Sequence, residues 1–273
     1  MDNRIEKHYV TSSNLANTIA ERLAAAGKDM AKLCTEDLAP VDEFHIRGRK
    51  ATLELAEQMN LGKDTRVLDI GSGLGGPART LAQSFGCHVT GVDLTEAFCE
   101  AATILSDWVG LGERVAFQQG DATDLPFGEQ EFDAAMTIHV AMNIEAKDQL
   151  YKHVRRVMKP GGIFTIYDVL QGEGGEVQYP VPWAREPSIS FLATPQDMEQ
   201  LLSDAGFNVL ATYDSTEESQ SWFEAMAKRL SESGPPPLTM QVFLGDDFPA
   251  MAKNQIQNLR ERRIRTVSYI CRA

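Results

Sequence analysis

Two kinds of apolar pattern alternate along the middle of the chain. Short runs rich in apolar and β-branched residues predict strands, and longer segments in which apolar residues recur every three to four positions predict helices. The expected strands span residues 66–70, 88–92, 114–118, 132–138 and 163–170. The expected helices between them span residues 80–85, 96–109 and 147–158. This order predicts an α/β fold with a mostly parallel sheet and helices on both of its faces.

Helical segments come before this region. Apolar residues four positions apart indicate an amphipathic helix that starts at Ser13 and ends near Gly27. A second helix is expected over residues 49–59. We therefore expect residues 1–60 to form an N-terminal helical lid and residues 61–273 to form the core domain.

The regular alternation stops after the fifth expected strand. Residues 171–193 are rich in glycine and proline and are too long for a simple connection, so we interpret them as a substrate loop. Thr194 and Pro195 have the N-cap and first-turn preferences of a new helix. Residues 215–263 predict helices that form a cap insertion, and the β-branched segment 264–271 predicts a last strand of the same sheet.

Composition and charge narrow the class of partner. The chain has 39 acidic and 26 basic residues and a formal net charge of -13, which repels phosphate backbones, so nucleic acid is not an expected partner. The four cysteines are scattered and the histidines lack metal-binding spacing, which predicts no metal site and fits a reducing compartment. The chain shows no signal-peptide pattern and no run of apolar residues long enough for a membrane span, so we expect a cytoplasmic protein.

A glycine-rich loop follows the first expected strand of the sheet. Residues 71–76 read Gly-Ser-Gly-Leu-Gly-Gly, and the absent side chains allow a sharp turn and a close approach of a ligand to the helix N-terminus. Asp93 ends the next strand, where a carboxylate can accept hydrogen bonds from both hydroxyl groups of a ribose. These features fit a dinucleotide and S-adenosylmethionine equally well.

Three further features favour S-adenosylmethionine. Asp69 lies two residues before the loop, where a carboxylate is unfavourable beside a pyrophosphate but stabilises an ammonium or sulfonium group. Asp121 follows the third strand, where its carboxylate can accept a hydrogen bond from the adenine amino group, and Ala122 leaves room for the ring. Residues 156–162 then join a helix tightly to the fifth strand.

At these residues the chain resembles the class I S-adenosylmethionine-dependent methyltransferases. The matching blocks appear in family order and read VLDIGSGLGG, VTGVDL, GDATDLPF, FDAAMTIHVAMNI and RRVMKPGGIFTIYDV. The resemblance implies a Rossmann-like seven-stranded sheet with an antiparallel last strand, and S-adenosylmethionine as cofactor, which is released as S-adenosylhomocysteine. The segments 42–45 and 181–192 are most similar to the sarcosine/dimethylglycine branch, which lies beside the ubiquinone- and tocopherol-type enzymes.

The resemblance also implies a set of cofactor contacts. The glycine loop would face the methionine moiety, the ends of the second and third strands would face the ribose and adenine, and the backbone after the fourth strand would meet the amino-acid part. The residues concerned are Asp69, Gly71, Ser72, Gly73, Asp93, Leu94, Asp121, Ala122, Ile138 and His139. Ser72 stands where many members of the family have cysteine.

Methyl transfer from a sulfonium is an in-line displacement that depends on alignment and on the exclusion of water. A base is needed only where the acceptor must lose a proton. His139 is the candidate general base, and the alternative is that only its backbone contributes. Tyr9, Phe44 and His45 are expected to cover the site from the lid, with ordinary helix packing as the alternative.

The substrate loop carries two further candidates for binding the acceptor. The indole of Trp183 can receive a cationic amine and Arg185 can bind a carboxylate, or Trp183 simply anchors the loop. The expected function is methylation of a small molecule: an amino acid or amine at nitrogen, or a natural product. A nicotinamide-dependent oxidoreductase and a non-catalytic S-adenosylmethionine-binding module are the alternatives, and a homodimer is compatible with the family.

Overall fold

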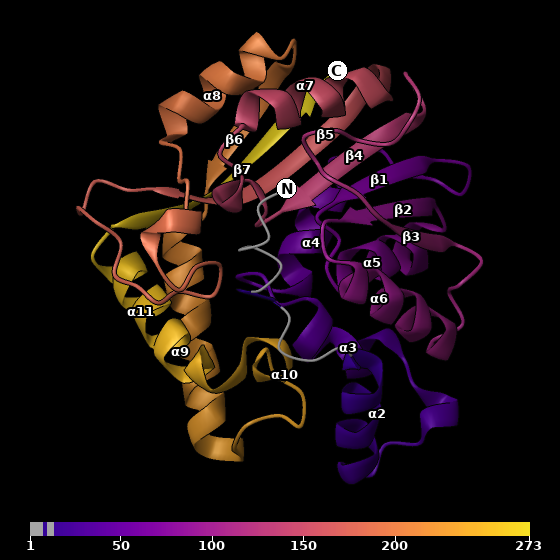
Figure 1. Cartoon of the computed structure of the whole chain (residues 1–273), viewed down its shortest axis with the longest axis vertical. Helices are drawn as coiled ribbons and strands as arrows, with labels where there is room; N and C mark the ends of the chain where they lie inside the picture. The colour runs from indigo at the N-terminus through magenta and orange to yellow at the C-terminus, as the bar shows by residue number, and fades with distance from the viewer. Residues whose placement is uncertain (1–7, 10–13) are drawn as a thin grey trace.

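The computed structural model describes residues 8–9 and 14–273, and a seven-stranded sheet lies at its centre (Figure 1). The strands are β1 (Arg66–Ile70), β2 (His88–Asp93), β3 (Val115–Gln119), β4 (Phe132–Ile138), β5 (Met158–Gln171), β6 (Asn208–Asp214) and β7 (Ile264–Arg272). Their order across the sheet is β3-β2-β1-β4-β5-β7-β6. The pairs from β3 to β5 are parallel, whereas β7 runs antiparallel to both β5 and β6. The expected sheet with an antiparallel last strand is confirmed.

Helices cover both faces of this sheet, as the alternating pattern predicts. Val67 and Leu68 of β1 are fully buried, because a central parallel strand packs against helices on its two sides. The covering helices are α7 (Lys147–Val157) and α8 (Pro195–Asp204) on one face, and α4 (Arg49–Ala56) and α5 (Gly76–Phe85) on the other. Helix α6 (Glu96–Trp108) connects β2 to β3.

Two element boundaries differ from the prediction. Helix α5 begins at Gly76, one turn earlier than expected, because Gly75 adopts a left-handed φ of +80° and caps the helix directly. Strand β5 begins at Met158 and not at Ile163, since the backbone after α7 pairs with β4 at once.

Within the described part of residues 1–60, which the sequence analysis expects to form a lid, α2 (Leu15–Ala25) and α3 (Thr35–Asp42) pack with α6 and the cap insertion, and we keep the name lid for them and for Tyr9, Phe44 and His45. Helix α4 packs against the sheet, because its apolar residues belong to the core of that face. Helix α2 corresponds to the expected amphipathic helix, although its expected start at Ser13 lies outside the described residues. The sequence pattern does not predict α3, because Pro40 lies inside this helix and its N-cap is Cys34.

The cap insertion consists of α9 (Thr216–Ser233), α10 (Gln241–Leu244), the short η4 (Gly245–Asp247) and α11 (Phe248–Arg260). The lid and the cap insertion share one hydrophobic cluster, in which Ile19 and Leu23 of α2 pack with Phe243 and Met251 of the cap. Leu105 of α6 belongs to the same cluster. The shared core therefore joins the lid and the cap above the core domain.

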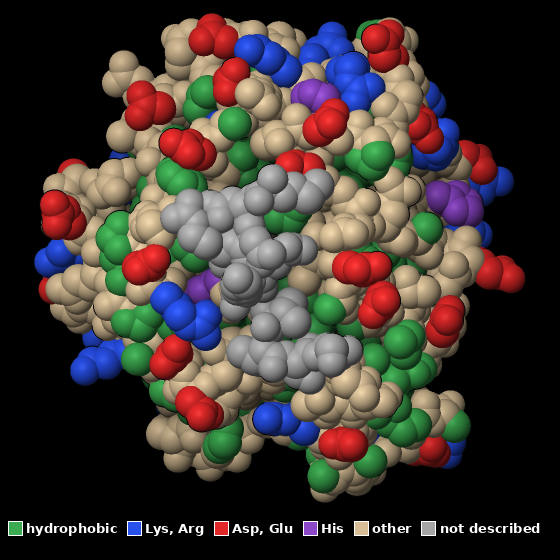
Figure 2. All heavy atoms as spheres, viewed as in Figure 1, with side chains coloured by type: hydrophobic (Ala, Val, Ile, Leu, Met, Phe, Trp, Pro, Cys, Tyr) green, Lys and Arg blue, Asp and Glu red, His purple; other side chains and the backbone are tan. Residues whose placement is uncertain are grey.

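Charged side chains are distributed over the one face that Figure 2 shows. On the face shown in Figure 2, acidic and basic side chains are interspersed and the basic ones form no continuous stripe. In the part of the chain that the structure describes, no helix is long and apolar enough to cross a membrane.

Candidate active site

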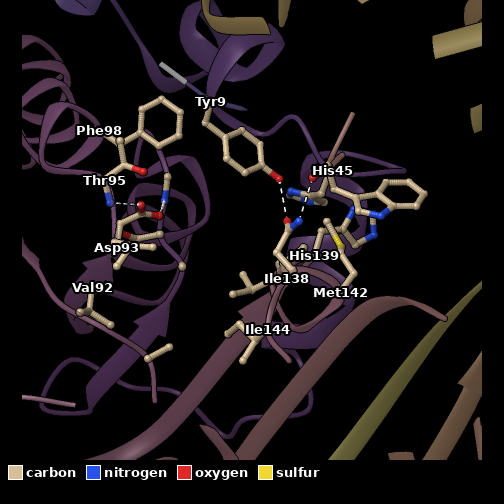
Figure 3. Close-up of a pocket in the computed structure, with 18 of the residues that line it drawn as sticks. Tyr9, His45, Val92, Asp93, Thr95, Phe98, Ile138, His139, Met142 and Ile144 are labelled. Atoms are coloured by element: carbon tan, nitrogen blue, oxygen red, sulfur yellow. Dashed lines mark hydrogen bonds between the residues drawn. The ribbon is translucent and has the colours of Figure 1, made fainter. Parts of the chain in front are cut away.

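A cavity of about 320 Å³ lies at the carboxyl ends of β1, β2 and β4. In Figure 3, Asp93 and Phe98 lie on one side of it and His45, His139 and Met142 on the other, with Tyr9 between them. The residues proposed from the sequence that line it are Tyr9, Phe44, His45, Gly71, Ser72, Gly73, Asp93, Leu94, Asp121, Ala122, Ile138, His139 and Trp183. Two others, Asp69 and Arg185, do not line the cavity.

We call the side next to the glycine loop the cofactor half and the remainder the acceptor half. The cofactor half is lined by residues 71–73, 92–95 and 120–123. The acceptor half is lined by Phe44, His45, His139, Met142, Asn143, Trp183, Phe191, Met240 and Gln255.

Asp93 holds the glycine loop in place. Its two carboxylate oxygens accept hydrogen bonds from the backbone N–H of Gly73 (2.8 Å) and of Thr95 (2.9 Å). Gly71 has a φ of +72°, and a Cβ atom at this position would lie 2.3 Å from Cγ2 of Val140, so only glycine fits there. The loop therefore has a fixed shape before any ligand binds.

Asp69 lies behind the glycine loop. Its side chain is buried (2% exposed), and Oδ2 has no hydrogen-bond partner among the described residues. The pKa of Asp69 is raised to about 7, mainly by burial and in addition by the nearby carboxylates of Asp93 and Glu43. A buried carboxyl group in this state is stabilised by a neighbouring cation.

Asp121 and Ala122 stand at the far end of the cofactor half. Oδ1 of Asp121 accepts hydrogen bonds from the backbone N–H (2.8 Å) and the hydroxyl (2.6 Å) of Thr123. These bonds fix the orientation of the carboxylate. The small side chain of Ala122 and the apolar side chain of Leu94 line the cavity beside it.

The cofactor half fits S-adenosylmethionine. Asp93 and Asp121 line it where the resemblance implies the ribose and the adenine, and Asp69, whose Oδ2 lacks a partner among the described residues, lies behind the glycine loop. S-adenosylmethionine supplies an electrophilic methyl group when it is bound.

His139 has an uncommon backbone conformation and a buried ring nitrogen. Its φ is +54°, and its N–H donates to the carbonyl of Tyr167 (2.7 Å). Nε2 is buried without a hydrogen-bond partner among the described residues. Burial holds the pKa of His139 well below 6.5, and the ring of His45, whose centroid is 6.1 Å away, lowers it further. The imidazole is therefore neutral at physiological pH and can accept a proton or a hydrogen bond.

The lid residues meet the acceptor half from above. The Tyr9 hydroxyl donates to Oδ1 of Asn143 (2.9 Å), and Phe44 packs against Phe243 of the cap with a centroid separation of 4.9 Å. Nε2 of His45 lies 2.9 Å from the carbonyl oxygen of Gly48. All three residues line the cavity and also contact other parts of the protein. The predicted role in covering the site and the alternative of ordinary packing are therefore compatible.

Trp183 and Arg185 differ from the prediction of a shared acceptor site. Trp183 is fully buried and donates from Nε1 to the Ser190 hydroxyl (3.0 Å), so it anchors the substrate loop while it lines the cavity. Arg185 points elsewhere: its guanidinium donates to Asp247 (3.0 Å) and to the carbonyl oxygen of His8 (2.9 Å). The guanidinium lies outside the cavity and is held by these two partners. It would have to leave them to bind the carboxylate of an acceptor.

Asn143 and Gln255 line the acceptor half but are not identified by the sequence analysis. Asn143 belongs to the block that carries His139, and its side chain donates to the carbonyl oxygens of Trp183 and Ile189 (2.8 Å each). Gln255 comes from α11, far from every family motif. In the sequence, the position of Asn143 five residues after the fourth strand is a weak signal, and no sequence signal marks Gln255.

The ordered motifs, the sheet and the fitted cofactor half define a class I S-adenosylmethionine-dependent methyltransferase domain. Residues 68–166 match the family model described as "Methyltransferase domain". This match decides between the two ligands that the glycine loop fits, in favour of S-adenosylmethionine.

Three known proteins illustrate the similarity. Sterol 24-C-methyltransferase ERG6B of Gibberella zeae is 38% identical over 116 residues, which cover 42% of this chain and 30% of that protein. A geranyl diphosphate methyltransferase in complex with S-adenosylmethionine has a TM-score of 0.66 at 17% identity, over 82% of this chain and 84% of that chain. A putative sarcosine dimethylglycine methyltransferase from Galdieria sulphuraria has a TM-score of 0.64 at 17% identity, over 82% and 84%. The match to the sterol enzyme spans about a third of that relative's length, and the two structures show a common fold.

Proposed function

We propose that this protein transfers the methyl group of S-adenosylmethionine to an uncharged, mainly apolar small molecule. The observation that carries the proposal is the lining of the cavity: none of the described residues that line it is lysine or arginine. Outside the cofactor half, the lining consists of apolar side chains, two histidines whose pKa values burial lowers, two amides, and the carboxylates of Asp42 and Glu145.

The absence of a cation in this lining argues against an anionic acceptor. A carboxylate or phosphate in a closed cavity needs a positive partner, because burying an unpaired charge is costly. Two cations beside the cavity already have partners: Arg185 donates to Asp247 and to His8, and Lys147 donates to the carbonyl oxygens of Ile144 and Phe191, which line the cavity. This arrangement favours a natural-product acceptor over an amino acid, and the acceptor named for the sterol relative is of the uncharged kind.

The chain's own residues have separate tasks in this reaction. Tyr9, Phe44 and Met240 close the acceptor half against water, which an in-line displacement requires. The neutral imidazole of His139 is placed to accept the proton of an acceptor hydroxyl group.

The test is an assay of S-adenosylhomocysteine release with pairs of matched acceptors. Uncharged compounds such as sterols, terpene alcohols and macrolide aglycones are compared with glycine, sarcosine, phosphoethanolamine and a prenyl diphosphate. We expect turnover only in the uncharged group. Turnover confined to the charged compounds, with the purified protein saturated in S-adenosylmethionine, would overturn the proposal.

The role of His139 is tested with the acceptor found in this way. His139→Gln keeps a hydrogen-bonding side chain, whereas His139→Phe removes it. We expect a loss of roughly 10²–10⁴-fold in turnover for the phenylalanine variant, the usual contribution of a general base. Equal turnover in both variants and the wild type would leave His139 with a backbone role only.

A further inference from the structure

Gln255 interrupts an otherwise apolar stripe on α11. Met251 and Leu259 lie four residues before and after it, and both side chains are completely buried. Residues four apart share one face of a helix, so all three point away from solvent. Gln255 itself is only 8% exposed and lines the cavity. An amide therefore occupies a position where packing alone favours leucine or methionine.

The neighbouring amides on α11 have clear structural partners. Asn254 donates to the carbonyl oxygen of Pro180 (3.0 Å). Asn258 accepts from the N–H of Gln178 (2.8 Å) and donates to its carbonyl oxygen (2.9 Å), so both asparagines bind the substrate loop. The side chain of Gln255 has no hydrogen bond within residues 8–9 and 14–273.

The amide of Gln255 is accessible from the cavity, since neither of its polar atoms is among the fully buried ones that lack a partner. Water in the cavity can therefore satisfy it in the absence of a ligand. A ligand that displaces this water loses affinity unless it offers equivalent hydrogen bonds, so a polar group of the ligand is the partner that the site can offer Gln255.

We propose that Gln255 determines specificity by recognising an uncharged polar group of the acceptor, such as a hydroxyl, carbonyl or amide. The inference rests on the proposed function. A carboxamide donates and accepts hydrogen bonds without bearing charge, and no lysine or arginine among the described residues lines the cavity to balance an anion.

The experiment compares acceptors that differ by one hydroxyl group: decanol with decanediol, and a monohydroxy steroid with its dihydroxy counterpart. The variant is Gln255→Met, which keeps the length of the side chain and removes the amide. We expect the wild type to prefer the dihydroxy compound by roughly tenfold in kcat/KM, the value of one buried hydrogen bond, and the variant to lose this preference. Gln241→Met, the same change at an exposed position of the cap, should retain it.

The stability of the variant separates a recognition role from a structural one. Because the amide has no partner in the fold, Gln255→Met should leave the unfolding midpoint unchanged or higher, whereas a structural glutamine would lower it. Equal preference for both members of each pair in the wild type, or a preference that survives in Gln255→Met, overturns this inference alone. Methylation confined to charged acceptors would instead overturn the proposed function.

Discussion

The hydroxyl group of Tyr9 donates a 2.9 Å hydrogen bond to Oδ1 of Asn143, a residue 134 positions away in the chain. The amide nitrogen of the same Asn143 donates to the carbonyl oxygens of Trp183 and Ile189 in the substrate loop. One buried side chain therefore joins the lid, the end of β4 and the substrate loop around the acceptor half.

Replacing the lid tyrosine should weaken the closed site without unfolding the protein. Tyr9→Phe removes one hydrogen bond, worth about 1 kcal/mol, and leaves Oδ1 of Asn143 unpaired. We expect KM for the acceptor to rise roughly fivefold and affinity for S-adenosylhomocysteine to change less. Steady-state kinetics and calorimetry check this, and an unchanged KM would show that the lid is held by other contacts.

Removing the carboxylate of Asp93 should affect the cofactor first. Asp93→Ala deletes the proposed acceptor for the ribose hydroxyls and also the acceptor for the Gly73 and Thr95 N–H groups. We expect binding of S-adenosylmethionine to weaken by roughly 1–3 kcal/mol. Calorimetric titration measures the dissociation constant. Asp124→Ala is the control, because this carboxylate is exposed and does not line the cavity.

Arg185 links His8, near the N-terminus, to the cap insertion. Its guanidinium contacts the carbonyl oxygens of His8 and Leu244 as well as Asp247. Because the ion pair with Asp247 is partly exposed, the bonds to the two carbonyl oxygens matter more. We expect Arg185→Ala to speed limited proteolysis near the N-terminus, and Arg185→Lys to restore little, since one ammonium cannot reach all three partners. Identical cleavage rates in the wild type and both variants would contradict this role.

The sheet and the cofactor half could be predicted from the sequence, because each strand and the loop that follows it form one short continuous segment. The block containing Asp69 and Gly71 forms a strand and turn by itself, and the apolar runs specify strands buried on both faces. The missed helix α3 lacks such local signals, since Pro40 lies inside it and Cys34 caps it.

The acceptor half depends on contacts that no local pattern encodes. Gln255 meets the cavity only because α11 packs back over the sheet, and Asn143 meets Tyr9 only because the lid folds across β4. For Arg185, a local pattern predicts a contact that the fold does not make. Its proximity to Trp183 in sequence suggested a shared site, but the turn formed by Val181 and Ala184 directs the two side chains to different partners.

Asp69 should make the stability of the protein depend on pH in a specific direction. Burial raises its pKa in the folded state from 3.8 to about 7, so the folded protein binds more protons than the unfolded chain between these values. The contribution of this group is fully present below about pH 3.8 and is lost as the pH rises through about 7. Asp69→Asn, which cannot ionise, should therefore gain stability relative to the wild type as the pH rises across this range.

The gain should reach at most about 1.4 kcal/mol per pH unit. Urea unfolding of both proteins between pH 5 and pH 8, without ligand, measures it, and contributions from other titrating groups cancel in the difference. The same substitution should weaken binding of S-adenosylmethionine, because it removes the carboxylate that we propose lies near the cationic groups of the ligand. Parallel stability curves for the two proteins would contradict the raised pKa and show that Asp69 ionises normally in the fold.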